Sequence, residues 1–458
     1  MVEGINNRTG TPGHTTISCY TCSVQARPKE IVRAVGRDVT FAWSGPDGPA
    51  TLGYGSVAVL RADQRPLSAI RREGKELLDR VDMTSGSSDS VPERAFPRFF
   101  GGVAFSPDRS SSHWEAFGRV QFVLPELQFT VCGSTTWLTL LGGADEEEGL
   151  RDEARRIRAE IEGFDGERPA HSEARELNRV GQQPADREEW EDMVRSALSH
   201  IERNELQKVV LAQRRELAFD APFDLDLLQE WLFDASGNSY RYLFRPHGQH
   251  AFVGRSPECI VQKDGTDVRS ESVGGTIETG ENRSQQEQLA EELVGNQKDQ
   301  REHSLVVKSI RDHLEPIAHS VKQEDQTVRV LSNVQHLCTP IHAQLMDDQH
   351  VLDLVEALHP TSAVGGYPRD RAMDLIHQLE PFDRGWYGGP IGWFDGDGDG
   401  CFAVGIRSGL MSERRVYLYA GAGIVEGSEP DREWEEVQWK FESMTSLITR
   451  RLSLARSH

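Results

Sequence analysis

The chain has 458 residues, of which 37% are hydrophobic and 27% are charged, a balance typical of a folded globular protein rather than a disordered one. Its formal net charge of −22 disfavours nucleic acids and anionic membranes as partners, because both attract basic faces. No apolar run reaches the ~20 residues of a transmembrane helix, and the opening segment MVEGINNRTGTPGHTT lacks the basic and apolar regions of a secretory signal. We therefore expect a cytoplasmic protein, for which length alone predicts about two or three domains.

Lysine and cysteine are both scarce. Only eight of the 51 basic residues are lysines, and acidic excess with so little lysine leads to the hypothesis of a surface adapted to high salt. Six scattered cysteines do not form a disulfide framework in a chain of this length. Cys19 and Cys22 form a single C-x-x-C without a second pair at zinc-site spacing, which favours two ordinary thiols over a metal or redox site.

The first half of the chain shows strands and helices in irregular order. Residues 1–95 are rich in Gly, Pro, Ser and Arg and carry little readable chemistry. FFGGVAF (99–105) predicts a strand, and VQFVLPELQFTV (120–131) predicts one or two more. Residues 144–162 and 187–203 are charged with recurrent apolar positions, which predicts two surface helices.

The middle of the chain predicts a meander of strands followed by a long helix. KVVLAQRREL (208–217) is β-branched and alternating, which predicts a strand, and short strands continue from 240 to 268. Apolar residues recur at helical spacing in a predicted helix over 284–319. VRVLSNVQHL (328–337) predicts one further strand, and a helix is expected near 349–358.

The last part of the chain adds a helix ending at Leu379, then two strands within 385–409 joined by an acidic turn, then a strand over 416–427 and a closing helix. The turn DGDGDG (395–400) begins like a calcium-binding loop, but its twelfth position is Ile406 rather than an acidic ligand, so a hairpin turn is favoured. GAGIVEG lacks the spacing of a dinucleotide-binding loop. Strands mixed with helices without strict alternation predict an α+β architecture around large sheets.

Two residues have the character of a proton-transfer pair. Lys208 begins an apolar strand in a chain that otherwise avoids lysine, although a solvated strand-end lysine is the ordinary alternative. Glu258 follows Pro257 between two apolar stretches, where burial would raise its carboxyl pKa and make it a proton donor, although a turn glutamate is equally common.

Three further carboxylates could hold a metal ion. Glu302 lies in the helical segment KDQREHSLVV, and Glu433, Glu436 and Lys440 share one helix stripe because they are spaced by three and four. Carboxylates from two helices that meet an anionic substrate suit Mg²⁺. For either helix alone, solvated charge with local salt bridges is the simpler interpretation.

Taken together, these segments resemble the chorismate-utilising enzyme family, which includes isochorismate, salicylate, anthranilate and aminodeoxychorismate synthases. The resemblance spans about residues 98–452, and so many ordered motifs are very specific. The motifs are FFGGVAF, KVVLA, FVGRSPE, DQREH with LVV, NVQHL, LHPTSAVGG, GPIGWFDGDGDG, VGIRSG and GAGIVEGSEPDREWEE with a following Lys.

The resemblance implies one large α/β-layered fold with two sheets and flanking helices around a deep site, so that residues 1–95 and 96–458 belong to a single domain. It implies a general base at Lys208, a general acid at Glu258 and chorismate as substrate. The remaining implied contacts are Mg²⁺ on Glu302 and Glu436 with Glu433 nearby, substrate carboxylates on Tyr387, Arg407, Lys440 and the backbone of Gly421 and Gly423, and further substrate contacts at His336, Ala363, Gly275 and Thr276.

Within the family, the residues favour formation of isochorismate. Lys208 argues against anthranilate synthases, which lack the base lysine, and Gly274 before Gly275 and Thr276 excludes the covalent lysine route of aminodeoxychorismate synthases. Salicylate synthases, which also eliminate pyruvate, typically have Thr where this chain has Ala363, and they remain the second choice. A catalytically inactive scaffold subunit is the alternative from another class, and the intact acid, base and metal carboxylates argue against it. The later fate of the product and the oligomeric state stay open.

Overall fold

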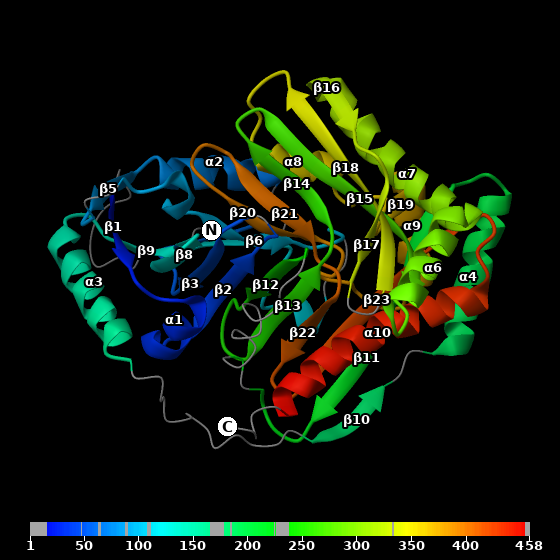
Figure 1. Ribbon diagram of the computed structural model, residues 1–458, viewed down its shortest axis with the longest axis horizontal. Helices are drawn as coiled ribbons and strands as arrows, with labels where there is room; N and C mark the ends of the chain where they lie inside the picture. Colours follow the sequence, from blue (N-terminus) through cyan, green and yellow to red (C-terminus); the bar gives the residue numbers. More distant parts are fainter. Residues whose placement is uncertain are drawn as a thin grey trace.

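Two large, mainly antiparallel sheets form the centre of the structure, which is a computed structural model (Figure 1). It describes residues 16–453 apart from 47, 63–65, 88–89, 108–110, 165–177, 184–185, 224, 226–237 and 332–333. Within these residues the larger sheet has 13 strands, in spatial order β10 (Arg179–Gln183), β11 (Lys208–Phe219), β23 (Arg415–Val425), β22 (Ser408–Ser412), β13 (His250–Ser256), β12 (Tyr240–Phe244), β2 (Val39–Ser44), β3 (Ala50–Tyr54), β8 (Leu127–Cys132), β9 (Thr135–Gly142), β1 (Ile17–Val24) and β5 (Val81–Ser85), with β19 (Gly366–Tyr367) beside β11. The smaller sheet has 10 strands in the same described part, in the order β16 (Ala318–Gln323), β18 (Val334–Leu345), β15 (Asp267–Glu278), β14 (Cys259–Asp264), β21 (Gly400–Val404), β20 (Pro390–Phe394), β6 (Phe99–Val103), β7 (Val120–Leu124) and β4 (Ala58–Arg61), with β17 (Thr327–Val330) beside β18.

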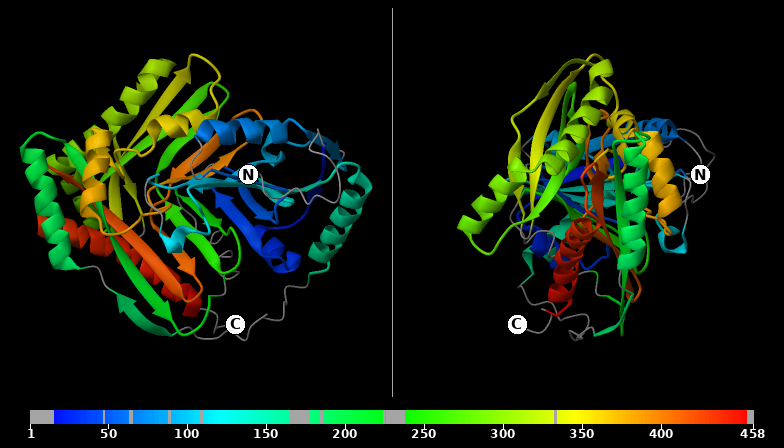
Figure 2. Two further views of the ribbon diagram at one scale, coloured as in Figure 1. Left: turned by 180° about the vertical axis from the view of Figure 1, so that it is seen from behind. Right: turned by 90° about the vertical axis from the view of Figure 1, so that its right-hand side faces the viewer.

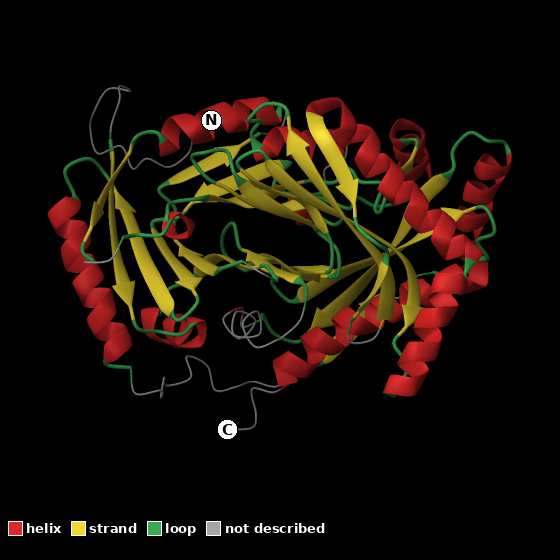
Figure 3. Cartoon of the chain, turned by 45° about the horizontal axis from the view of Figure 1, so that its top comes forward, coloured by secondary structure: helices red, strands yellow, loops and turns green. Residues whose placement is uncertain are grey.

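Helices flank both sheets, and Figure 3 shows them around the strands. In the described residues they are α1 (Pro28–Val35), α2 (Leu67–Leu78), α3 (Glu147–Glu162), α4 (Arg187–Glu202), α6 (Arg283–Gly295), α7 (Gln297–Leu314), α8 (Val351–Leu358), α9 (Arg369–Leu379) and α10 (Pro430–Ser453). The views in Figure 2 show α10, coloured red, running next to β11 and β23. Helix α7 contacts β15 of the smaller sheet and β23 of the larger one, so it bridges the two sheets.

Aromatic side chains fill the space between the two sheets. Phe41 on β2 of the larger sheet stacks on Phe100 on β6 of the smaller one, with ring centroids 3.6 Å apart. Trp386 packs against Phe117 and Phe252 in the same cluster. Packing of two sheets through their apolar inner faces excludes water from the interior and stabilises both layers.

The glycines of FFGGVAF are explained by this packing. A side chain at Gly102 would come within 2.7 Å of the Trp386 ring, so the strand can approach the aromatic cluster only without one. At Gly101 an added Cβ would collide with the backbone of Gln121 on the paired strand β7. The double glycine therefore permits close packing of β6 on both sides.

The residues before position 95 contribute strands to both sheets. Strand β2 pairs with β12 in the larger sheet, and β4 pairs with β7 in the smaller one. Helices α1 and α2 also come from this part. The sequence alone did not reveal these elements, because short apolar bursts among Gly and Pro lack a clear period.

Most of the strands and helices expected between residues 99 and 453 are present, but two expectations are wrong. The expected helix over 284–319 is two helices, because Asn296 ends α6 and its side chain accepts hydrogen bonds from the backbone N–H groups of Lys298 and Asp299 as the cap of α7. The expected single strand over 328–337 is a hairpin of β17 and β18, in which Val328 pairs with Leu337.

Two other expectations are confirmed in more detail than the sequence allowed. The acidic segment 395–400 is the turn between the antiparallel strands β20 and β21. The segment 120–131 contains two strands, and they lie in different sheets, β7 in the smaller and β8 in the larger.

No helix in the described part of the chain combines the length and apolarity needed to cross a membrane.

A buried ion pair joins three segments near the start of β11. Arg384 and Glu380 are 3% and 2% exposed, and the Arg384 guanidinium donates to Glu380 and to the carbonyl oxygens of Val210 and Val364, at 2.7 and 2.8 Å. Glu380 in turn accepts from the backbone N–H of Ala212 at 2.8 Å. These bonds hold β11 against the loop that follows α8, where water cannot replace them.

We expect Glu380→Ala to lower the free energy of unfolding by about 3–5 kcal/mol, because it leaves a buried guanidinium without its carboxylate. Glu216→Ala is the control, since Glu216 pairs at 2.9 Å with Arg415, whose side chain is 58% exposed, and it should cost less than about 1 kcal/mol. Chemical denaturation of both variants measures the difference. Equal losses would contradict the role given to the buried pair.

Candidate active site

Lys208 lies at the start of β11 and is completely buried. Its ammonium nitrogen is 3.2 Å from Oε1 of Glu302 on α7. Burial lowers the pKa of Lys208 because the charged form is poorly solvated, although the Glu302 carboxylate opposes this shift. The side chain therefore has the environment of an amine that can lose its proton, not of a solvated strand-end lysine.

Glu258 lies just before β14 and is 2% exposed. Its backbone N–H donates to Ser256 Oγ at 3.3 Å, while Oε1 has no hydrogen-bond partner among the described residues. Burial, reinforced by the Glu271 carboxylate, raises the pKa of Glu258 to about 8, against the opposing influence of Lys208 and Arg329. A carboxyl with this pKa is mostly protonated at neutral pH and can donate a proton.

Two of the three metal carboxylates predicted from the sequence contact a lysine that the sequence did not single out. Lys298 on α7 lies 3.4 Å from Oε2 of Glu302 and 3.0 Å from Oε1 of Glu433 on α10. Asp299 is 3.8 Å from the same ammonium, while Glu436 pairs with Lys440 at 2.5 Å. The only sequence signal for Lys298 is that it is one of eight lysines in the chain.

Two carboxyl groups of this cluster have pKa values shifted in opposite directions. Burial raises the pKa of Glu433 to about 7, and its Oε2 is buried without a hydrogen-bond partner in the described part of the chain. For Glu302, burial is outweighed by Lys208, Lys298 and Lys440, which hold its pKa at about 2. Within the described residues no three His, Cys, Asp or Glu side chains form a metal-binding group, so the predicted ligand set stays a prediction.

Arg407 and His336 form a second polar group. Arg407 is 9% exposed, has φ of 50°, and donates to Nε2 of His336 at 3.0 Å. The His336 Nδ1 lies 3.0 Å from the Gly275 carbonyl and 3.2 Å from Thr276 Oγ1. With Nδ1 donating and Nε2 accepting, the ring is neutral, and burial together with Arg407 holds its pKa well below the ordinary value.

Glycines on β23 bring backbone and charged groups into close contact. Lys440 donates to the Gly421 carbonyl at 2.7 Å, and a side chain at position 421 would lie 3.4 Å from the Tyr387 hydroxyl. At Gly423 an added Cβ would collide with the Glu302 carboxylate and lie 3.1 Å from Cε of Lys208. Glycine at 423 is therefore required for Lys208 and Glu302 to meet beside this strand.

The loop 361–365 carries the last predicted contact. Ala363 is partly buried there, and the Gly365 carbonyl accepts from the Val210 N–H of β11 at 2.8 Å. Thr361 and Ser362 are 5% and 1% exposed, and their hydroxyl groups have no hydrogen-bond partner among the described residues. These two hydroxyls are candidate polar contacts that the sequence analysis missed, because Thr and Ser in a loop carry no distinctive pattern.

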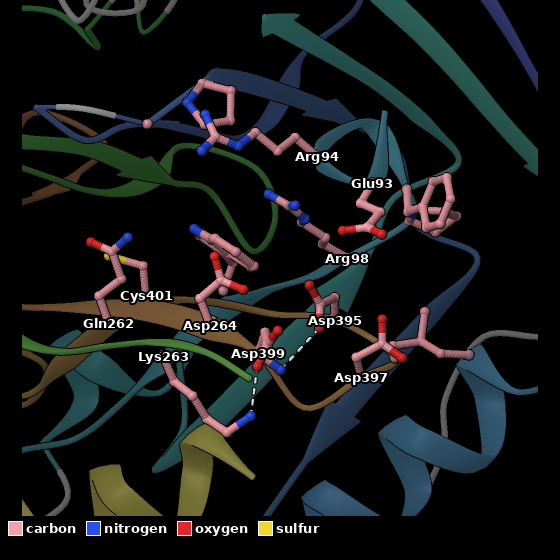
Figure 4. Close-up of a pocket in the computed structure, with 18 of the residues that line it drawn as sticks. Glu93, Arg94, Arg98, Gln262, Lys263, Asp264, Asp395, Asp397, Asp399 and Cys401 are labelled. Atoms are coloured by element: carbon pink, nitrogen blue, oxygen red, sulfur yellow. Dashed lines mark hydrogen bonds and ion pairs between the residues drawn. The ribbon is translucent and has the colours of Figure 1, made fainter. Parts of the chain in front are cut away.

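A cavity of about 400 Å³ lies elsewhere, and Figure 4 shows it. Its walls include Trp393, Arg98 and Lys263, whose ammonium reaches Asp399 at 2.5 Å. None of the site residues predicted from the sequence lines it. The predicted site residues lie instead on or beside β11 and β23 of the larger sheet, β14, β15 and β18 of the smaller sheet, and helices α7 and α10.

Buried titratable groups with opposite pKa shifts, such as Lys208 and Glu258, are typical of an enzyme active site. Residues 13–449 match the chorismate binding enzyme family, and the chain belongs to that family. The family resemblance inferred from the motifs is thus confirmed.

Relatives and solved structures agree with this assignment. The chain is 34% identical over 420 residues to the isochorismate synthase MenF of Bacillus subtilis, covering 89% of this chain and 87% of that one. It is 35% identical over 382 residues to the salicylate biosynthesis isochorismate synthase of Pseudomonas aeruginosa, covering 79% and 76%. The structure of MenF, the menaquinone-specific isochorismate synthase from Escherichia coli, superposes with a TM-score of 0.76 at 27% identity and 96% coverage of both chains. The expected α+β architecture with two large sheets is confirmed.

The raised pKa of Glu258 predicts a pH-dependent effect of Glu258→Gln on stability. In the folded parent the pKa is about 8, above the ordinary carboxyl value, so Glu258 contributes stability at low pH that is lost as the pH rises towards 8. The amide mimics the protonated acid and has no such loss. Relative to the parent, the variant should therefore gain stability between about pH 5 and about pH 8, as measured by thermal unfolding. Parallel pH profiles would contradict the raised pKa.

Proposed function

We propose that this chain is an isochorismate synthase, an isomerase that converts chorismate to isochorismate. The observation that carries the proposal is the placement of two buried groups with opposite shifts, an amine whose pKa burial lowers and a carboxyl whose pKa burial raises. The relatives that cover most of the chain support the same activity. An inactive scaffold would gain nothing from burying such groups, because each one costs solvation energy.

The reaction needs one proton to be taken and another to be given. Lys208 is the general base that removes a proton from the water attacking ring carbon C2. Glu258 is the general acid that protonates the departing C4 hydroxyl, so one water enters as another leaves. Opposite pKa shifts in neighbouring groups assign such roles by environment.

The two carboxylates of chorismate require local positive charge in a chain of net charge −22. Arg407, Lys440 and the backbone N–H groups of Gly421 and Gly423 supply donors for them, with the Tyr387 hydroxyl beside Gly421. His336, held by Gly275 and Thr276, contacts the ring side. Ala363 stands where salicylate synthases typically have Thr, which favours a reaction that ends at isochorismate.

Magnesium fits the acidic cluster of α7 and α10. Glu302, Glu433 and Glu436 would hold it, and Mg²⁺ would compete with the Lys298 ammonium for the same carboxylates. When bound, the ion neutralises and orients a substrate carboxylate. The unpartnered oxygen of Glu433 supports this assignment, since buried carboxylate oxygens normally have a partner.

Product analysis is the direct test of the proposed function. Incubated with chorismate and Mg²⁺, the protein should yield isochorismate alone, detected by chromatography. Salicylate with pyruvate would establish the salicylate synthase alternative, and no turnover would establish the scaffold alternative.

Lys208→Ala should lower kcat by ~10²-fold or more, because it removes the proton acceptor. Lys322→Ala is the matched control, since Lys322 is exposed on β16 and should change kcat little. Steady-state rates with chorismate check both variants. A near-normal kcat in Lys208→Ala would exclude that residue as the base.

Direct titration of Mg²⁺ without substrate should separate the cluster's members. Glu302→Gln should weaken binding by about tenfold or more because it removes a ligand charge, and Lys298→Met should strengthen it because it removes the competing ammonium. Glu435→Gln, on the exposed face of α10, is the control and should leave the affinity unchanged. Isothermal calorimetry provides the measurement, and identical affinities in all four proteins would reject the ligand assignment.

A further inference from the structure

The turn that carries Glu258 is attached to a buried ion pair on two other strands. Arg329 on β17 binds both carboxylate oxygens of Glu271 on β15, at 3.0 and 3.1 Å. The same guanidinium donates to the carbonyl oxygen of Pro257, the residue directly before Glu258. Glu271 is 2% exposed, so this contact is shielded from water.

The strand register places the pair on the face of the sheet that carries the site. Arg329 is paired with His336, and Glu271 with Pro340, both on β18. Cross-strand partners point to the same face, and residues two apart on a strand also share a face. The pair therefore spans β18 on the face where His336 and Cys338 lie.

Burial of the Glu271–Arg329 ion pair has a desolvation cost that further contacts must offset. Burying two charges removes their hydration, and their mutual attraction offsets this loss only with good geometry and further hydrogen bonds. Here Arg269 adds a third contact to Glu271 at 2.9 Å, and the remaining bond of Arg329 goes to the peptide that presents Glu258. Arg329 thus links the ion pair to the peptide bond that precedes Glu258.

Both charges also act on the Glu258 carboxyl through space. Glu271 raises its pKa and Arg329 lowers it, while Lys208 on β11 also lowers it. These are the charged groups that face Glu258 from the elements packed around it. Loss of either member of the pair would leave one of two opposing influences without its counterpart.

We propose that Glu271 and Arg329 are positioning residues for the reaction: they fix the Pro257–Glu258 peptide so that the acid faces the substrate and they balance the charge around it. This inference rests on the proposed function, because it assigns the pair a task in that reaction. Neither residue touches the substrate; each acts through Glu258.

The test compares Glu271→Gln, Arg329→Gln and the double variant in the full-length protein. Each should lower kcat by about 10- to 100-fold, with KM changed less than about threefold, because small displacements of an acid impair chemistry more than binding. The alkaline limb of kcat/KM, where Glu258 loses its proton, should move to lower pH in Glu271→Gln and to higher pH in Arg329→Gln. In the double variant it should return close to the parent position.

Arg329→Lys separates position from charge. Lysine keeps the positive charge but cannot form a bidentate contact with the Glu271 carboxylate while it also donates to the Pro257 carbonyl oxygen. We expect kcat to fall while the alkaline limb stays within ~0.3 pH units of the parent.

Lys263→Gln is the buried control on the same strand that follows Glu258. Lys263 pairs with Asp399 at 2.5 Å and Asp348 at 2.9 Å, and it lines the cavity of Figure 4, whose walls do not include Glu258. This variant should lose thermal stability without moving the alkaline limb. If Glu271→Gln and Arg329→Gln behave like Lys263→Gln, the pair is only structural and the inference is overturned.

An infrared titration of the Glu258 carboxyl, identified by subtraction of the Glu258→Gln spectrum, provides a readout independent of turnover. Its midpoint should shift in opposite directions in the two single variants. A parent protein that forms no isochorismate would defeat the proposed function. The titration would still show whether Glu271 and Arg329 set the pKa of Glu258. Unshifted midpoints in both single variants, in a parent that does form isochorismate, would defeat the inference alone.

Discussion

The removal of charged side chains from water is the constraint on which the rest of this structure depends. Lys208, Glu258, Glu302 and Glu433 are all at least nine-tenths buried, and each would be neutralised or expelled without partners. Opposite charges alternate along two helices and the strand β11: Glu433 contacts Lys298, Lys298 contacts Glu302, and Glu302 contacts Lys208. Glu258 has no such ion pair with the residues that the structure describes, and burial raises its pKa to about 8.

Backbone contacts fix the strands that carry these charged side chains. Gly423 leaves room for Glu302 beside Lys208, and Arg384 with Glu380 ties β11 to the loop that carries Ala363. The aromatic layer between the sheets excludes water from the adjoining interior. Electrostatic effects are larger in such an environment than in solvent, so modest displacements of these groups change their proton affinities.

The sequence predicted those elements whose local residue pattern is distinctive. The strand that begins at Lys208 was readable from its alternation, and the turn 395–400 from its glycines and flanking strands. The predicted contacts His336, Arg407 and Lys440 lie in one connected polar region with the predicted carboxylates. Their roles came from family resemblance rather than from periodicity or spacing.

What remained hidden depends on long-range contacts. The role of Arg329 at the Pro257 carbonyl follows from the pairing of β17 with β18, and the expected single strand over 328–337 concealed that hairpin. Lys298 looked like an ordinary helix charge, because nothing in its own helix shows that α10 brings Glu433 beside it. The break at Asn296 was likewise masked by helix-forming residues on both sides.

The pairing of β2 with β12 and of β6 with β20 has a consequence for biosynthesis. Each sheet joins early and late parts of the chain, so β12 and β20 are synthesised long after β2 and β6. The nascent chain must hold its first strands without these neighbours until the later strands have been made, and pairings this distant in sequence form slowly. Production of this enzyme should therefore depend on chaperones that shield unpaired strand edges during synthesis.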